Sequence, residues 1–499
     1  MPELSFQEST RNELIEDLDR RRPLVDIYDA YMQGRHVCGF KAVEDNDVAD
    51  MIAAVADNWC ELIVIAATER MDIDGLRLAS SPRVDNDPFA NDFTAWDIFR
   101  RNGLDEDLPL LFDTAVSTGE GYLLVWPDQD DSEKAEITIE HPSQMIVKYS
   151  PRNRRRIEAA LKKWKDGDTE HVYLWLPDGL YRWSRGKNEV WKDLGAEDSF
   201  TRNPFDENVV PVFPIVNRPQ ARPANPANIL LHAPHNLANA AVGLGKSDLA
   251  NVISTQDEIN ELLRGMLVAS EYQAYQQRWV AGLERSDDEE VDPDDPDAVP
   301  PEPPFYAGPG KLWEAESSDT KFGAFPAADL KMFLDAMNNR VQSMASRSHT
   351  PHYYFSGGGN ISNVSEGGLK ALDTGLVARV RNKFKPFGGG IRRAVTLALQ
   401  YESPDHAGVM VEIDWTDPEA RSEAQHVDAA IKKIAAGVPL QQIWEDLNYT
   451  PEQIARFRGW ALQNAQEAWL LDPLARADAF ELPAAEVDEN GEPVATGIG

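Results

Sequence analysis

Cysteine is nearly absent from this chain: only Cys38 and Cys60 occur in 499 residues. Two cysteines cannot supply the disulfide framework on which small secreted domains depend, so a reducing compartment is expected. The first ten residues are polar and acidic and hold no apolar signal region. The longest apolar run, residues 62–67, is far too short to span a bilayer. These absences predict a soluble protein that is made inside a cell and has no membrane partner.

Basic side chains are scarce as well, with 49 Lys and Arg against 84 Asp and Glu and a net charge of −35. A protein that grips DNA needs a basic footprint, because its affinity comes from neutralising phosphates and releasing their counterions. A strongly acidic surface favours solubility. It also suits a surface that must not hold nucleic acid.

A convincing catalytic or metal-binding set is also missing. His36 and Cys38 alone do not make a metal site. His349 and His352 stand near two tyrosines but favour packing around a proline over catalysis. The acidic run 287–302 has carboxylates that suit Ca²⁺, but it lacks the ligand spacing and glycine turn of a calcium loop. The sequence therefore predicts no enzyme activity, no metal and no cofactor.

One motif keeps a nucleotide hydrolase open as an alternative. Residues 240–247, AAVGLGKS, fit a loose phosphate-binding loop with Ala240 in place of the first glycine. In such a site Lys246 would reach the phosphates and Ser247 would bind Mg²⁺. The preceding strand is poor, and the alternation of strands and helices that the fold needs is missing. A glycine-rich lead-in with Ser247 as a helix cap is the simpler interpretation.

The pattern of apolar residues divides the first half of the chain into two parts. Residues 8–118 are expected to be helical, with Asp47 capping a helix that runs past Ile63, a second helix over 95–102 and a third over 105–116. Residues 120–217 are rich in β-branched and aromatic residues and predict an antiparallel meander. The expected strands cover 121–127, 136–140, 145–149, 172–176 and 180–183.

Two long helices of similar length, 247–272 and 327–346, bracket a small insert. The acidic, proline-bearing run 287–302 cannot bury a core and predicts an extended loop. The flanking pieces 279–282 and 309–314 are candidates for short strands. This arrangement suggests an antiparallel helix pair with a small head at its far end.

A glycine- and serine-rich loop, residues 355–365, opens a third long helix that is expected to run from Glu366 to Phe384. Four basic residues, Arg379, Arg381, Lys383 and Lys385, are expected to crowd the end of this helix, where the helix dipole favours cations. Residues 409–415 predict a strand. Helices are expected within 418–468, broken at 437–439, followed by a disordered tail.

The order of several short segments resembles the portal proteins of tailed bacteriophages, of the siphovirus type found in actinobacterial hosts. The resemblance covers most of residues 10–465, and no single segment is diagnostic by itself. The segments that carry it are Val216-Asn-Arg-Pro219, Gly243-Leu-Gly-Lys-Ser-Asp-Leu-Ala250, Gln256-Asp-Glu-Ile-Asn260, Met266-Leu-Val-Ala-Ser-Glu271, Gln277-Arg-Trp-Val-Ala-Gly282 and Ser365-Glu-Gly-Gly-Leu369.

The resemblance implies an α+β multidomain portal fold that forms a ring of twelve, with a helical and antiparallel-β wing, a two-helix stem, a small α/β clip and a helical crown. The implied parts are the wing 1–246, stem helices 247–272 and 327–346, the clip 273–326, the tunnel loop 351–365, a long helix with the wing return 366–416, crown-side helices 417–470 and a disordered tail 471–499. Another structural head protein is the remaining alternative, although adaptors are usually far shorter.

The resemblance also implies a location and partners: the portal vertex of the virion, after assembly in the host cytoplasm. The partners would be double-stranded DNA passing without sequence-specific binding, a terminase, a head–tail adaptor, and capsid and scaffolding proteins. The expected DNA-facing residues of the tunnel loop are Ser356, Gly357, Gly358, Gly359, Asn360, Ser362 and Asn363. The expected partner contacts in the clip are Trp279, Asp287, Asp288, Glu289, Glu290 and Trp313.

Overall fold

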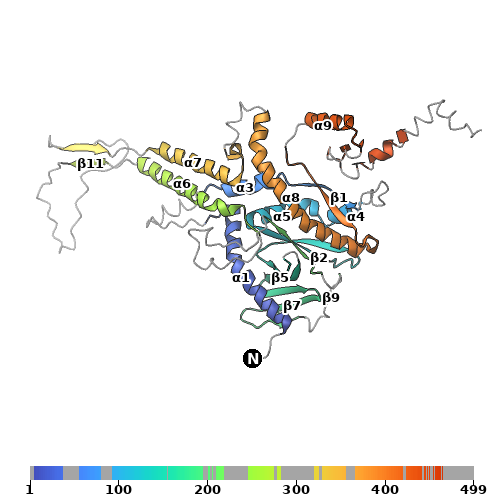
Figure 1. The fold of residues 1–499 in the computed structure, drawn as a ribbon. Helices are drawn as coiled ribbons and strands as arrows, with labels where there is room; N and C mark the ends of the chain where they lie inside the picture. Colours follow the sequence, from blue (N-terminus) through green and yellow to red (C-terminus); the bar gives the residue numbers. More distant parts are fainter. Residues whose placement is uncertain are drawn as a thin grey trace, which may run out of the picture. The chain divides into compact units, whose positions relative to one another are not determined.

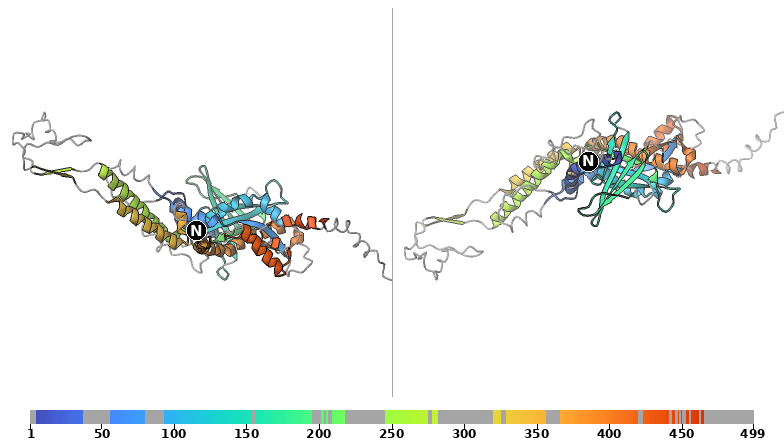
Figure 2. Two further views of the ribbon diagram at one scale, coloured as in Figure 1. Left: turned by 90° about the horizontal axis from the view of Figure 1, so that it is seen from above. Right: turned by 90° about the horizontal axis from the view of Figure 1, so that it is seen from below.

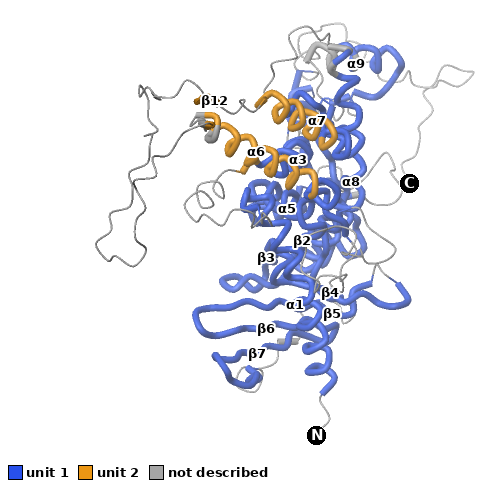
Figure 3. Tube along the Cα trace, turned by 90° about the vertical axis from the view of Figure 1, so that its left-hand side faces the viewer, with its two compact units in different colours: residues 1–37, 58–253, 345–499 blue, residues 38–57, 254–344 orange. Residues whose placement is uncertain are grey.

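A computed structural model gives the fold of the chain in two compact units (Figure 3). Unit 1 consists of residues 1–37, 58–253 and 345–499, and unit 2 of residues 38–57 and 254–344. The structure describes residues 5–36, 56–79, 93–153, 156–194, 201–202, 205, 209–217, 245–274, 278–281, 320–324, 329–355, 366–419 and 423–440, with single positions between 443 and 464.

Unit 1 begins with the long helix α1, Phe6–Met32. Ser5 caps it, since its hydroxyl accepts a hydrogen bond from the Glu8 backbone N–H while the Glu8 carboxylate accepts one from the Ser5 N–H. Leu14 and Leu18 are buried against the neighbouring sheet. This first segment is helical as predicted.

Three shorter helices follow: α3 (Trp59–Thr68), α4 (Thr94–Arg101) and α5 (Leu104–Thr118). The last two confirm the predicted helices. The predicted helix from Asp47 past Ile63 is wrong in its start, because residues 56–58 are not helical and Asn58 caps α3. Residues 47–55, which supplied the first half of that apolar stripe, lie outside the described part of the chain.

The first part of the chain also contains a strand, β1 (Ile73–Ala79), where only helix was predicted. Its antiparallel partner is β13 (Met410–Trp415), which confirms the strand predicted over 409–415. A strand whose partner lies more than 300 residues further on has no neighbouring turn signal to mark it, so local patterns missed it.

Residues 120–217 form antiparallel strands, as predicted, but in two sheets (Figure 1). The first has the order β10-β2-β3, and the second has β4-β5-β6-β7-β8, with β9 also paired to β7. The strands are β2 (Glu120–Pro127), β3 (Ala135–Glu140), β4 (Met145–Tyr149), β5 (Ile157–Asp166), β6 (Thr169–Leu176), β7 (Gly179–Arg185), β8 (Lys192–Asp193), β9 (Thr201–Arg202) and β10 (Val212–Val216).

The larger sheet is buried on both faces, which follows from the alternation of side chains along each strand. One face, with Ile146 and Leu161, packs on Leu14 of α1. The other, with Met145 and Ala160, packs with β2 and β10. Strand β5 was not predicted, because three lysines and a run of small residues hide its apolar face.

Unit 2 holds the helices α6 (Ile253–Ala274) and α7 (Leu330–Ser348). Residue 253 of α6 and residues 345–348 of α7 belong to unit 1. The helices run antiparallel side by side (Figure 2), with Arg340 paired to Glu258 at 3.2 Å. Between them in sequence, β11 (Arg278–Ala281) pairs with β12 (Lys321–Ala324). The helix pair and the first strand are confirmed, whereas the candidate strand 309–314 and the acidic run 287–302 lie outside the described residues.

Helix α8, Glu366–Glu402, is much longer than predicted. Pro386 and three glycines after it suggested an end near Phe384, but the helix continues through them. Its far half is anchored by packing, because Phe387 and Ile391 are fully buried against β10, β2, β3 and β13. Gly390 serves this packing, since a Cβ at this position would lie 2.3 Å from Ile215 Cδ1.

Beyond β13 the chain is helical again in α9 (Glu423–Ala435) and over residues 456–461. The predicted break at 437–439 is confirmed, since Gly437 has a φ of +83° and its N–H donates to the Ile434 carbonyl. Ile443 and Ile454 are buried beyond that break. The tail 471–499 lies outside the described residues.

Candidate functional site: helix α8 and the segments bound to it

Most of the residues predicted to contact DNA or partners lie outside the described part of the chain. This holds for the whole set in the glycine-rich loop, Ser356 to Asn363, and for Trp313 and the four acidic residues 287–290. The two ends of the loop are described: the short helix η4, His352–Phe355, and the start of α8. Trp279 is described too. The candidate site therefore consists of α8 and the segments that bind to it.

A polar cluster joins both ends of the glycine-rich loop to α3. The Tyr353 hydroxyl donates to Asp373 on α8 at 2.6 Å, and Arg70 donates to Asp373 at 3.2 Å. Arg70 also donates to the Tyr354 hydroxyl at 3.0 Å, which in turn donates to Glu69 at 2.5 Å. We call these five residues the latch. Arg70 thereby binds both Tyr354, just before the loop, and Asp373 on α8, after the loop.

Burial, followed by the hydrogen bond to Asp373, raises the pKa of Tyr353 above its usual value. Burial also raises the pKa of Tyr354, with the hydrogen bond to Glu69 adding to it. Both phenols therefore stay protonated at neutral pH and act as hydrogen-bond donors. The latch is held together by protonated phenols and an ion pair, an arrangement suited to fastening a loop rather than to proton transfer.

A set of deeply buried charges begins six residues beyond Asp373 on α8, at Arg379. Arg379 and Lys383, four residues apart on one face of the helix, both bind the carboxylate of Asp248. The distances from Asp248 Oδ2 are 2.7 Å to Arg379 Nη2 and 2.9 Å to Lys383 Nζ. All three side chains are at most 4% exposed. Buried charges of this kind persist only when they are paired and hydrogen-bonded.

Asn217, the residue after β10, completes this buried cluster. Its amide donates to Asp248 Oδ1 at 3.0 Å and to the Lys246 carbonyl at 2.9 Å, and its side-chain oxygen accepts from Lys383 Nζ at 2.6 Å. We call Asn217, Asp248, Arg379 and Lys383 the hub. Asp248 directly precedes the turn η3, Leu249–Asn251, which leads into α6.

The guanidinium of Arg379 uses all of its five N–H donors. Nε and Nη2 donate to Asp248, and Nη2 also donates to the Ile63 carbonyl of α3 at 3.0 Å. Nη1 donates to the Ser348 carbonyl at 3.1 Å and to the Thr350 hydroxyl at 3.2 Å. One side chain thus binds the segment that leads into α6, the segment that leaves α7, and α3.

The basic residues of α8 were predicted to crowd its end, and that prediction is wrong, since the helix runs on to Glu402. Arg379 and Lys383 lie in the hub, whereas Arg381 and Lys385 are exposed. Arg381 pairs with Asp417 at 3.0 Å. The sequence did carry a signal for the hub, because Asn217 and Asp248 both belong to the segments that carry the resemblance. That Asn217 and Asp248 contact each other could not be derived without the fold.

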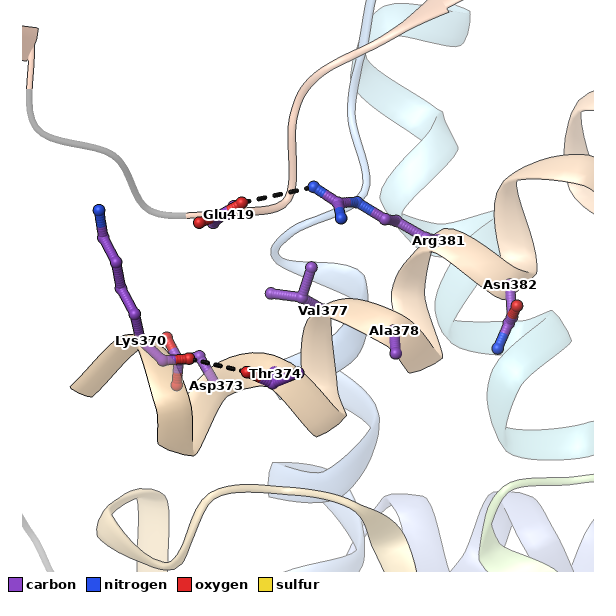
Figure 4. A pocket seen from close by; sticks show the side chains of 8 residues that line it. All are labelled: Lys370, Asp373, Thr374, Val377, Ala378, Arg381, Asn382 and Glu419. Carbon is purple, nitrogen blue, oxygen red and sulfur yellow. Dashed lines mark hydrogen bonds and ion pairs between the residues drawn. The ribbon is translucent and has the colours of Figure 1, made fainter. Parts of the chain in front are cut away.

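A shallow groove of about 370 Å³ lies along the first half of α8. Figure 4 shows Arg381 reaching Glu419, with Val377 on the same side of α8 and Ala378 as a further lining residue. The remaining lining residues are Lys370, Asp373, Thr374 and Asn382. Its charges are largely paired within the chain, since Asp373 belongs to the latch and Arg381 binds two carboxylates. This groove gives no indication of a catalytic site.

The segment that suggested a phosphate-binding loop is built into the core instead. Residues 240–244 lie outside the described chain, but Gly245 to Ser247 are described. The Ser247 hydroxyl is buried, donates to the Ser117 carbonyl and accepts from the Leu249 N–H at 2.9 Å. A hydroxyl so engaged is not available to Mg²⁺. The prediction that Ser247 caps the following helix is wrong, because the N-cap of η3 is Asp248 and α6 begins only at Ile253.

The other candidate residues stay apart. His349 has a φ of +54° at the end of α7, and His352 begins η4. Cys38 lies outside the described residues, and Cys60 is a buried free thiol. Within the described ranges, no three His, Cys, Asp or Glu side chains gather as a metal site would require. The helices described there include none with the length and apolar content to cross a bilayer.

Trp279 lies on the hairpin of unit 2, where its indole covers Gly323 of the partner strand. A Cβ at position 323 would stand 2.4 Å from the indole ring, so only glycine fits under it. Trp279 remains 40% exposed and Phe322 42% exposed. The hairpin therefore presents two aromatic rings to its surroundings.

The comparisons with known proteins agree with the resemblance in the sequence. The model of the family "Phage portal protein, SPP1 Gp6-like" matches residues 11–466, nearly the whole chain. The chain belongs to this family of phage portal proteins. The family is one of structural proteins of the virion. No curated protein matches the chain.

Among solved structures, the chain is similar to one described as the neck of an empty GTA particle computed with C6 symmetry. The identity is 13%, and the TM-score is 0.41. The match covers 81% of this chain and 96% of the other.

Proposed function

We propose that this protein is the portal subunit that forms a twelve-membered ring at one vertex of a phage capsid, through which the genome is packaged and ejected. The observation that carries the proposal is the family match over residues 11–466. Assembly would take place in the host cytoplasm, with scaffolding and capsid proteins around the ring. The subunit has no chemistry of its own in this proposal, and the energy for packaging comes from a separate terminase.

The helix pair of unit 2 supports the assignment of a stem to this chain. In a ring, a stem helix packs on its neighbours with one face and lines a channel with another. Helix α7 leaves Met332 68% exposed and Leu334 47% exposed, which fits a helix whose apolar surface is covered only on assembly. The hairpin of β11 and β12, with Trp279, corresponds in this proposal to the clip, which would contact first the terminase and then the head–tail adaptor.

The charge of the chain supports a conduit rather than a DNA-binding protein. A ring of subunits that each carry −35 repels DNA overall instead of neutralising its phosphates, so DNA passes without being held. The glycine-rich loop 356–363 offers small neutral side chains with glycine's conformational freedom. Fastened by the latch at one end and by α8 at the other, it could follow the DNA while its anchors stay in place.

The direct test is the mass and shape of the purified protein, by mass photometry with electron-microscope class averages. Twelve copies of 55.7 kDa predict a ring near ~670 kDa with a central hole. A chain that stays a monomer both alone and when co-expressed with its scaffolding protein would overturn the proposal. ATP turnover that is lost in Lys246→Ala would favour the nucleotide hydrolase instead.

A further inference from the structure

The hub closes a long excursion of the chain at its base. The chain leaves unit 1 after Ile253 and returns to it at Ala345, and the excursion as named here, residues 249–348, includes the flanking residues of unit 1. Arg379 binds Asp248 just before the excursion and Thr350 just after it. The two segments are about 100 positions apart in sequence. Besides Arg379, the residues at the entry to the excursion contact Asn217, Lys383 and the end of α5.

We propose that Arg379 is a positioning residue that clamps the entry and the exit of this excursion to α8 and α3 at once. The number of N–H donors on the Arg379 guanidinium supports this role. A guanidinium is a planar fork with five N–H groups, and here they bind four acceptor atoms on three segments, with Nε and Nη2 sharing Asp248 Oδ2. A lysine in the same place carries the same charge but only three donors on one atom, so it cannot reach all three segments.

The burial of Arg379 and Asp248 supports the same role. The Arg379 side chain is 4% exposed and the Asp248 side chain 2% exposed, so water cannot replace a lost partner. Leaving a buried donor or carboxylate without its partner is costly. Loss of the guanidinium itself should therefore release both ends of the excursion together, whereas loss of one acceptor should release only the segment that carries it.

In the assembled ring, this clamp would keep the entry and exit of each helix pair at fixed places in unit 1 while the genome moves. That part rests on the proposed function, whereas the clamp itself does not. Both can be tested separately, because the clamp is a property of the single subunit and the ring a property of the assembly.

The test is hydrogen–deuterium exchange, read by mass spectrometry, on the full-length protein with Arg379→Lys. We expect amides in residues 249–253 and 345–350 to exchange about ten times faster or more, with β5 and β6 unchanged. The matched control is Arg381→Lys, which changes an exposed arginine on the same helix and should leave both segments as in the wild type.

Exchange that matches the wild type at both segments would refute the clamp. So would an equal rise throughout the sheets, which would show general destabilisation instead of positioning, or release of only one segment. If Arg379→Lys does not fold, Thr350→Val removes one acceptor at the exit alone. It should then speed exchange over 345–350 and leave 249–253 unchanged, and the opposite pattern would refute the proposal. Ring formation, measured in parallel, tests the proposed function independently.

Discussion

Gly390 of α8 lies against Ile215 of β10 so closely that a Cβ on residue 390 would stand 2.3 Å from Ile215 Cδ1 and 2.8 Å from the Pro214 carbonyl oxygen. Its neighbour Gly389 has no atom within 4 Å of the same position. Two adjacent glycines of one helix therefore have different reasons to be there. Gly390 permits contact between helix and sheet, whereas Gly389 has no packing role.

We predict opposite effects of alanine at these two positions. Gly390→Ala forces the helix off the sheet and should lower the free energy of unfolding by about 1–3 kcal/mol. Gly389→Ala gains helix propensity without a clash and should raise it by about 0.5–1 kcal/mol. Thermal unfolding of the two variants decides the matter. Equal melting temperatures would mean that α8 does not contact β10 as described.

A second pair tests the role of the segment before α6. Ser247→Ala removes a buried hydroxyl that bonds Ser117 and Leu249, and should cost about 1–3 kcal/mol of stability. Lys246→Ala removes an exposed amine that donates to Asn251 and should change stability by less than about 0.5 kcal/mol. Denaturant unfolding measures both. A phosphate-binding loop would give a different result, with ATP turnover that depends on Lys246.

A third prediction concerns pH. Burial raises the pKa of Asp113 on α5, although the Thr68 hydroxyl donates to this carboxyl at 2.6 Å. A raised pKa in the folded state means that the group favours folding most below its unfolded value of 3.8, and that this contribution is lost as the pH rises through the folded pKa.

Asp113→Asn should therefore raise the melting temperature at pH 7, where the wild-type carboxylate is charged and partly desolvated. The gain should shrink as the pH falls and vanish near pH 3, where the carboxyl is protonated in both states. Melting curves of the two proteins from pH 3 to pH 7 provide the measurement. A gain that is independent of pH would point to packing rather than charge.

The fourth prediction tests the clip. Trp279→Ala and Trp313→Ala, singly or together, should weaken binding of the terminase and of the head–tail adaptor, because aromatic anchors carry much of the energy of such interfaces. Biolayer interferometry with each partner measures the loss. Val190→Ala, at a residue 89% exposed in unit 1, is the control for an apolar surface change elsewhere. Unchanged binding in both tryptophan variants would remove the hairpin from the interface.

Local patterns in the sequence predicted elements whose partners are close in the chain. Most strands between Gly121 and Trp183, although not β5, and the two helices around the insert were found because alternation and helical spacing express local burial. The same rules misjudged α8. Pro386 and Gly390 look like the end of a helix, and only the sheet packed against them explains why the helix continues.

The hub escaped prediction for a related reason. Asn217, Asp248 and Arg379 are ordinary polar residues in sequence, and their burial is produced by five segments meeting in the fold. A charged residue on a helix is expected to be solvated, so nothing local distinguishes Arg379 from Arg381. The loop and clip residues remain predictions, because they lie outside the described part of the chain.

The pairing of β1 with β13 sets the order in which this protein can fold. The ladder joins residues such as Arg77 and Asp414, which also form an ion pair and are separated by 337 positions. Pairing over such a distance closes a large loop and is slow. During synthesis β1 must wait, with its edge open, until the ribosome has made the sheets, both long helices of the excursion and all of α8. A nascent chain therefore cannot complete unit 1 until the excursion 249–348 has been made, so the helix pair of unit 2 exists before the ladder that closes unit 1.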